Sequence, residues 1–133
     1  MSSKKKPHTV SSKGASCVRT MDLYRSLGYT VWKMEHWCHF SRKRKDFLGF
    51  IDVLAFDDEK IIGIQDTTWG QTAARKKKIL ASPLAWDWLQ CPSRVIEIVG
   101  HKAPDKAKGR HRWEHKIIEI ILEDFTDGRP HEQ

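Results

Sequence analysis

The chain has 133 residues, a length that fits one domain with a single hydrophobic core. Its 24 Lys and Arg residues outnumber its 17 Asp and Glu residues, and this net charge of +7 indicates a polyanionic partner such as nucleic acid, with a merely solubilising surface as the alternative. No apolar run approaches membrane-spanning length, and 3 scattered cysteines without an apolar leader predict a reducing, cytoplasmic setting and no membrane contact.

The two ends of the chain are predicted to be tails. Residues 1–13 are basic and polar and contain Pro7, so they cannot bury enough apolar surface to order themselves. This N-terminal tail is either inert or a loose phosphate contact. We expect the folded domain over residues 14–125 and a flexible C-terminal tail over 126–133.

The domain is predicted to begin with a helix and a strand. Apolar residues recur at helical spacing over about Ala15–Leu27, and Gly28 follows as a natural helix stop. The segment Tyr29–Trp37 is rich in β-branched and aromatic residues, which predicts a strand. A charged loop is predicted over Ser41–Lys45.

Two further strands are predicted over about Phe47–Phe56 and Lys60–Thr68. The acidic stretch between them is short, so these strands should form an antiparallel hairpin. A helix over about Gln71–Leu80 follows, and its continuation over Leu84–Leu89 is an open alternative.

The rest of the domain is predicted to hold one more strand and a last element. Arg94–Val99 is a short run of strong strand formers, and Lys102–Arg112 is a basic loop. Trp113–Leu122 alternates weakly and fits a strand, a short helix or both. The order of helix, three strands, helix and strand predicts an α/β fold.

Two polar residues occupy positions on the hairpin where burial would penalise them. Asp52 lies in an otherwise apolar run, and Gln65 lies near the end of the next strand. A buried carboxylate costs several kcal/mol unless it is paired, hydrogen-bonded or bound to a metal. The hairpin would let the two residues meet. The alternative is a structural Asp52 that holds backbone amides or the basic Arg-Lys loop before its strand.

The strand before the hairpin offers two more candidates. Lys33 and Glu35 project to the same side of that strand, because side chains alternate. With Asp52 and Gln65 they would form an oxygen-rich pocket that suits Mg²⁺, or Mn²⁺ in its place, at a phosphodiester. The alternative is a Lys33–Glu35 pair on a solvated face, and a register shift of one residue would turn both away from Asp52.

The run Asp46-Phe-Leu-Gly-Phe-Ile-Asp52, followed by Gly-Ile-Gln65-Asp-Thr67, resembles the metal-binding motif of the PD-(D/E)XK nuclease superfamily. The resemblance is closest to its small Holliday-junction-resolvase-like and phage-type nucleases and spans about Ala15–Val99. It implies a restriction-endonuclease-like α-β-β-β-α-β core with a mixed central sheet flanked by helices. It also implies the aspartate role for Asp52, the second acidic role for Gln65 and the lysine position for Thr67.

Two motif positions depart from the superfamily pattern, and the acidic residue expected in the first helix is not evident, since Asp22 lies later than expected. Gln65 can ligate through its carbonyl oxygen but carries no charge, and Thr67 has no ammonium group to position water. Lys33 or the run Arg75–Lys77 could replace the lysine, and Glu35 would restore the missing negative charge. The predicted catalytic residues are thus Lys33, Glu35, Asp52, Gln65 and Thr67, of which Glu35, Asp52 and Gln65 hold the metal.

Two basic clusters flank the predicted site, one just before the Asp52 strand and the other at the start of the helix after the Gln65 strand. Both should lie where a phosphate backbone passes, and such contacts position DNA without reading its sequence. Solvated charge runs are the alternative. The predicted DNA-binding residues are Arg42, Lys43, Arg44, Lys45, Arg75, Lys76, Lys77 and Lys78.

These features predict a metal-dependent DNA endonuclease that hydrolyses phosphodiester bonds and selects DNA structure, of the Holliday-junction-resolving or phage-recombination type. Two symmetric cuts at a junction need two sites, so a homodimer is expected. One alternative is a DNA-binding protein that keeps the fold without the chemistry, which Gln65 and Thr67 favour. The other, a basic RNA-binding module, leaves Asp52 unexplained.

Overall fold

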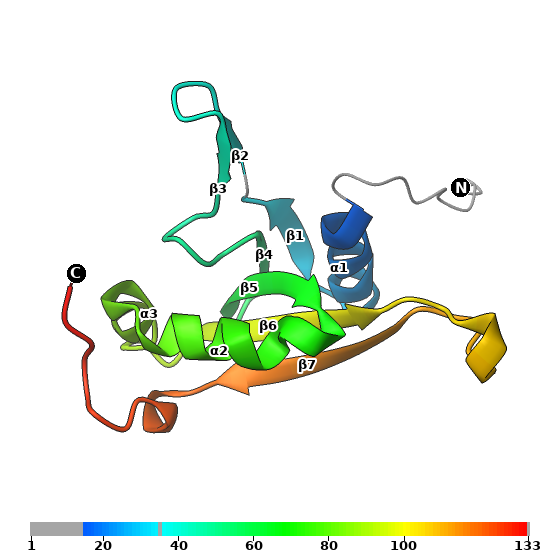
Figure 1. Cartoon of the computed structure of the whole chain (residues 1–133). Helices are drawn as coiled ribbons and strands as arrows, with labels where there is room; N and C mark the ends of the chain where they lie inside the picture. The colour runs from blue at the N-terminus through cyan, green and yellow to red at the C-terminus, as the bar shows by residue number, and fades with distance from the viewer. Residues whose placement is uncertain (1–14, 35, 133) are drawn as a thin grey trace.

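The computed structural model of this chain describes residues 15–34 and 36–132 (Figure 1). Over these residues the chain has the expected α/β fold, with a five-stranded mixed sheet flanked by helices and a separate two-stranded ribbon. The predicted N-terminal tail over 1–13 and the predicted ligand Glu35 lie outside the described residues. Across the described ranges, none of the helices has both the length and the apolar character that crossing a bilayer requires.

The first helix, α1 (Ala15–Ser26), forms where the apolar spacing predicts it. Cys17 and Tyr24 are buried against one face of the sheet. Gly28, with φ of +98°, then turns the chain, and its N–H donates to the carbonyl of Arg25 at 3.0 Å. A left-handed glycine directly after a helix is a common stop, so the predicted helix is confirmed.

Three antiparallel neighbours form the first half of the sheet: β1 (Thr30–Lys33), β4 (Val53–Phe56) and β5 (Ile61–Thr68). In the turn between β4 and β5, the Asp57 carboxylate accepts the backbone N–H groups of Glu59 at 2.9 Å and Lys60 at 3.0 Å. An aspartate that bonds the amides following it stabilises a turn. The predicted antiparallel hairpin is confirmed.

The chain between β1 and β4 differs from the prediction. The strand predicted over Tyr29–Trp37 divides, because β1 ends at Lys33 and β2 (His36–Cys38) belongs to the other sheet. β2 pairs with β3 (Lys43–Lys45), so the predicted loop over Ser41–Lys45 is in part a strand. This two-stranded ribbon stands away from the main sheet (Figure 1). A ribbon outside the main sheet has no alternation of apolar residues by which the sequence could indicate it.

The strand predicted over Phe47–Phe56 is also shorter, because β4 begins only at Val53. The residues before it form a turn in which Leu48 and Gly49 have φ of +58° and +85°. Leucine rarely adopts this left-handed region, so residue type does not predict the reversal. The turn buries Ile51 completely, with a relative exposure of 0%.

Helices also cover the other face of the sheet: the 3₁₀ turn η1 (Trp69–Gln71), α2 (Thr72–Leu80) and α3 (Pro83–Trp88). The Ser82 hydroxyl caps α3 by accepting the N–H of Ala85 at 3.3 Å, and Pro83 occupies the first turn. A cap and a proline start a new helix rather than prolong the old one. The predicted helix over Gln71–Leu80 is confirmed, and the alternative continuation is a helix of its own.

The second half of the sheet contains β6 (Arg94–Lys102), parallel to β5, and β7 (Glu114–Ile120), antiparallel to β6. The sheet order is therefore β1-β4-β5-β6-β7. The strand predicted over Arg94–Val99 is confirmed and continues to Lys102. The weakly alternating segment 113–122 is mainly a strand, which the short 3₁₀ helix η3 (Leu122–Asp124) follows; another, η2 (Lys106–Lys108), lies in the basic loop.

Alternation along β5 divides its side chains between two cores. Ile62 and Ile64 pack with α1, whereas a Cβ at Gly63 would meet Ile51 and then Trp88 of α3, both in the core on the other face. Gln65 therefore lies on the α2–α3 face, and Asp66, the next residue, lies on the α1 face. The two faces of β5 thus carry two different sets of polar groups.

Candidate functional site

Asp52 lies directly before β4 and is only 5% exposed. Its Oδ2 accepts one hydrogen bond from Gln65 Nε2 at 3.0 Å and another from the backbone N–H of Asp66 at 2.8 Å. The hairpin register causes this contact, because the Asp52 N–H continues the β4–β5 ladder by donating to the carbonyl of Ile64 at 2.8 Å. The structure therefore brings Asp52 and Gln65 together.

A second carboxyl group, that of Asp46, lies against Asp52. Burial is the main reason that the pKa of Asp52 rises to about 8, and a hydrogen bond with Asp46 raises it further. The bond from the Asp66 amide acts in the opposite direction and lowers this pKa. At neutral pH the site therefore keeps a proton that an exposed aspartate would have lost. A cation bound between the two carboxylates would replace that proton.

Sequence reasoning gave Asp46 no role, although it belongs to the motif that contains Asp52. Its contact with Asp52 depends on the left-handed turn at Leu48 and Gly49, which returns the chain. The sequence signal for such a role is that Asp46 and Asp52 lie at the two ends of one short apolar run. Without the turn, that signal does not bring the two carboxyls together.

Lys33 does not lie beside Asp52. It pairs with Val53 across β1 and β4, and directly opposed residues share a face of the sheet. Since neighbours in a strand alternate, Lys33 and Asp52 lie on opposite faces, and Lys33 is exposed on the α1 side. The other residue predicted on this strand, Glu35, lies outside the described residues.

Thr67 occupies the position of the superfamily lysine. It is buried, with a relative exposure of 8%, and lies opposite Gly100 of β6. Its hydroxyl brings hydrogen-bonding capacity but no positive charge. Asp52, Gln65 and Thr67 thus supply carboxyl, amide and hydroxyl groups, and none of the three supplies an ammonium.

The predicted basic cluster on α2 is spread around the helix. Consecutive helical residues are roughly 100° apart, so Arg75 to Lys78 cannot form one patch. Lys76 forms an ion pair with Asp124 at 3.8 Å, and Lys77 and Lys78 are exposed. Arg75 is half-buried, and its Nε has no hydrogen-bond partner within the described part of the chain.

The other predicted cluster lies on the β2–β3 ribbon. Arg42, Lys43 and Lys45 are exposed, while the side chain of Arg44 is outside the description. The ribbon ends directly before Asp46, so its base is at the carboxyl pair. An exposed basic ribbon that starts at the candidate site is well placed to contact a phosphate backbone.

A buried polar network that the sequence did not indicate lies on the α1 face. Asp66 Oδ1 accepts a hydrogen bond from the Thr20 hydroxyl at 2.6 Å and lies 2.8 Å from His101 Nε2. Thr20 and His101 also contact each other at 2.8 Å. The network joins α1, β5 and β6, and its members are separated widely in the sequence. No local pattern could have identified it.

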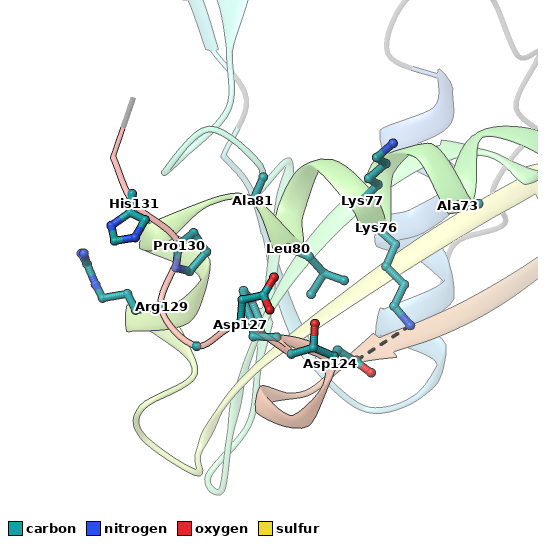
Figure 2. A pocket seen from close by; sticks show the side chains of 13 residues that line it. Ala73, Lys76, Lys77, Leu80, Ala81, Asp124, Asp127, Arg129, Pro130 and His131 are labelled. Carbon is teal, nitrogen blue, oxygen red and sulfur yellow. Dashed lines mark ion pairs between the residues drawn. The ribbon is translucent and has the colours of Figure 1, made fainter.

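A cavity of about 580 Å³ lies between α2 and the C-terminal segment (Figure 2). Figure 2 shows Lys76 extending toward Asp124, and their charges form an ion pair. Arg129 also has a partner, because its guanidinium donates to both oxygens of Asp87 at 2.9 Å. Neither Asp52 nor Gln65 lines this cavity. We therefore place the candidate site at Asp52 and not in the cavity.

The composition of the site limits which metal it could hold. Over residues 15–34 and 36–132, no group of three His, Cys, Asp or Glu side chains is arranged to hold an ion. Asp46 and Asp52, with the Gln65 amide, fit a Mg²⁺ ion that keeps several waters or substrate oxygens. They do not fit an ion enclosed by protein ligands alone.

Comparisons of this chain with known protein families, curated proteins and solved structures find no match.

Proposed function

We propose that this protein is a metal-dependent DNA endonuclease of the PD-(D/E)XK type, which cleaves branched DNA as Holliday junction resolvases do. The main support is the buried carboxyl of Asp52, which is hydrogen-bonded to the carboxyl of Asp46 and to the amide of Gln65. The sheet order and the order α1-β1-β4-β5-α2-β6 support a restriction-endonuclease-like core. In this order Asp52 comes directly before the second strand, β4, and Gln65 lies late in the third strand, β5.

Each residue of the site has a role in this proposal. Asp52 and Asp46 would hold the cation, and Asp52 would give up the proton that it keeps without the cation. Gln65 fixes the Asp52 carboxylate through its amide N–H and can turn its carbonyl oxygen toward the ion. A bound Mg²⁺ supplies a Lewis acid for the phosphodiester and lowers the pKa of its bound water.

The charge around the site supports DNA as the substrate class. The exposed Arg42, Lys43 and Lys45 lead from solvent to Asp46, so a phosphate backbone along the ribbon would pass the carboxyl pair. Such contacts recognise backbone shape rather than sequence. Resolution of a junction by two symmetric cuts would need a homodimer. We place the activity in the cytoplasm, because the 3 scattered cysteines fit a reducing compartment.

A second candidate function is DNA binding without cleavage. Gln65 brings no charge to Asp52, and Thr67 provides no ammonium where the superfamily has a lysine. Lys33, one of the proposed replacements, lies on the opposite face of the sheet. A chain with these substitutions could hold DNA on the same ribbon and leave it intact.

Cleavage of labelled DNA distinguishes the two functions. Four-way junction, flap, single-stranded and duplex substrates are incubated with Mg²⁺ or Mn²⁺, and Asp52→Asn is tested in parallel with the wild-type protein. We expect cleavage of branched DNA by the wild type and a loss of roughly a hundredfold or more in Asp52→Asn. The ranking of substrates would define the type of nuclease.

Asp58→Asn is the matched control, because Asp58 is an exposed aspartate in the turn of the same hairpin. This variant should cleave as the wild type does. Tight binding of junctions without cleavage in either metal would contradict the nuclease and support the second candidate. Equal activity of Asp52→Asn and wild type would exclude Asp52 from the reaction.

A further inference from the structure

A separate cavity of about 550 Å³ lies where β5 and β6 end, and nothing in the proposed cleavage reaction uses it. Thr67 and Thr68 come from the end of β5, while His101 and Lys102 come from the end of β6. Ligands of open α/β sheets bind outside the carboxyl ends of parallel strands. The cavity therefore occupies the place in this fold where a ligand is expected.

Two tryptophans form the walls of this cavity, and cations lie on both of them. The guanidinium carbon of Arg19 is 3.5 Å from the ring centre of Trp113. The ammonium groups of Lys102 and Lys116 are 4.2 and 4.8 Å from the ring centre of Trp69. Aromatic rings stack on nucleobases, and the cations around them attract phosphate.

The buried polar atoms at the cavity lack partners. Arg19 Nε and Nη1 are buried and have no hydrogen-bond acceptor within the described part of the chain. His101 lines the cavity, is only 4% exposed, and its Nδ1 also has no partner there. A buried donor without an acceptor is costly, so the two Arg19 nitrogens favour a ligand that supplies acceptor oxygens. In a neutral His101 ring whose Nε2–H faces Asp66, Nδ1 is an acceptor and favours a donor instead.

The nearby carboxylate does not satisfy these groups. Asp66 attracts Arg19 and opposes the lowering of its pKa by burial. However, Asp66 Oδ1 already binds Thr20 and His101 Nε2. Arg19 and Lys102 in the lining, with Lys116 on the Trp69 ring, therefore leave the cavity with an excess of positive charge.

We propose that this cavity binds one unpaired nucleotide of a DNA strand, with its phosphate on Arg19 and Lys102 and its base against Trp113, which has one cation over its ring where Trp69 has two. The planar fork of arginine matches two phosphate oxygens. A base within a duplex is stacked and cannot enter, so the cavity selects strands with unpaired nucleotides. The inference rests on the proposed function, because it gives that nuclease a means to recognise branched or flapped DNA.

The test compares Arg19 with a second arginine that lies over a tryptophan. Arg94, at the opposite end of β6, has its guanidinium carbon 5.8 Å from the ring centre of Trp88. Arg19→Lys and Arg94→Lys each keep the charge and remove the planar fork. Both are made in the full chain carrying Asp52→Asn, and binding of a labelled oligothymidine is measured by fluorescence anisotropy without metal. We expect Arg19→Lys to weaken binding about tenfold and Arg94→Lys to leave it unchanged.

A second pair of variants tests the aromatic wall. Trp113→Ala should weaken binding of the oligothymidine by about tenfold, whereas Trp113→Phe should retain most of it, because phenylalanine still stacks on a base. Circular dichroism and thermal melting establish that each variant is folded. Equal affinities of folded Trp113→Ala and Trp113→Phe would overturn the stacking role.

Competition experiments distinguish binding of a nucleotide from binding of smaller molecules that carry only its base or only its phosphate. Thymidine monophosphate should displace the oligothymidine, whereas thymidine and inorganic phosphate should each be at least about tenfold weaker competitors, because each supplies only half of the contacts. Phosphate as effective as the nucleotide would show a simple anion patch and overturn the proposal. Equal loss in Arg19→Lys and Arg94→Lys would also overturn it.

No cleavage enters these measurements, so they can fail independently of the nuclease. Binding that depends on Arg19, in a wild-type protein that cleaves nothing, would contradict the proposed function and retain the nucleotide site. If cleavage depends on Asp52 but neither Arg19→Lys nor Trp113→Ala weakens binding of the oligothymidine, the nuclease is retained and the nucleotide site is rejected.

Discussion

The side chains of Asp52 and Asp66 are both buried. The backbone N–H of Asp66 donates to the carboxylate of Asp52, yet the surroundings of the two carboxylates differ. Asp66 lies on the α1 face, where the Thr20 hydroxyl and the His101 ring both bond its Oδ1. Asp52 lies on the other face, where one amide side chain and one backbone N–H face it, together with the carboxyl of Asp46. Burial alone therefore does not distinguish a structural carboxylate from a candidate ligand.

The partners make that distinction. Donors from α1 and β6 bind Asp66, so the folded protein contains the groups that it needs. A second carboxyl faces Asp52, so the folded protein leaves it short of positive charge. Proteins place carboxylates close together mainly where a cation or a proton joins them. Mutations at the two aspartates should accordingly have opposite effects on stability.

The largest effect is expected from Asp66→Ala. This change leaves His101 and Thr20 buried without their shared acceptor, and the loss of one partner of a buried network costs about 3–5 kcal/mol. Urea denaturation should show the decrease in the free energy of unfolding, and Asp58→Ala, at an exposed position, should change it little. A loss of less than about 1 kcal/mol in Asp66→Ala would remove the structural role from Asp66.

An effect of opposite sign is expected from Asp52→Asn, and it should depend on pH. The pKa of Asp52 is about 8 in the folded protein, far above about 3.9 in an unfolded chain. Between these values the folded state binds one more proton, so the free energy of unfolding of the wild type falls as pH rises. Asp52→Asn lacks this pH dependence and should be the more stable protein by about 3 kcal/mol at pH 6, with little difference near pH 4.

Urea denaturation of both proteins across this pH range measures the difference. Mg²⁺ at pH 8 should raise the melting temperature of the wild type and not that of Asp52→Asn, because the ion binds the carboxylates of the folded state. Parallel pH profiles of the two proteins would show that Asp52 titrates as an ordinary aspartate.

The smallest effect is expected from Asp46→Asn. Removal of the charge of Asp46 should lower the pKa of Asp52, since that charge and the bond between the two carboxyls both raise it. The pH at which stability declines should then move downward, with a change of about 1 kcal/mol or less at neutral pH. The same pH series detects the shift, and Asp58→Asn should not show it. If the pH dependence of stability in Asp46→Asn is the same as in the wild type, burial alone raises the pKa of Asp52.

The parts of the fold with local causes could be predicted from the sequence. The helix that Gly28 ends and the hairpin closed by Asp57 have their signals in neighbouring residues. The contact between Asp52 and Gln65 followed from the same hairpin. The β2–β3 ribbon and the turn at Leu48 did not follow, because one has no apolar alternation and the other needs a rare backbone conformation.

The unpredicted parts of the site depend on contacts between distant segments. The side of the sheet on which Lys33 lies depends on its pairing with Val53, and the end of β1 was predicted too late. The bonds of Asp66 depend on where β6 pairs with β5 and on where α1 packs. Such registers are fixed by the whole sheet, and a single sequence contains no direct record of them.

The alternation along β5 also limits how this chain can change over generations. Gln65 and Asp66 are neighbours in sequence but serve opposite faces of one strand. Substitutions can alter either residue separately, whereas the loss or gain of one residue in β5 would exchange the two faces and disrupt both sets of partners at once. Descendants of this protein should therefore tolerate length changes in the turn at Asp57 and in the ribbon far more readily than within Ile61–Thr68.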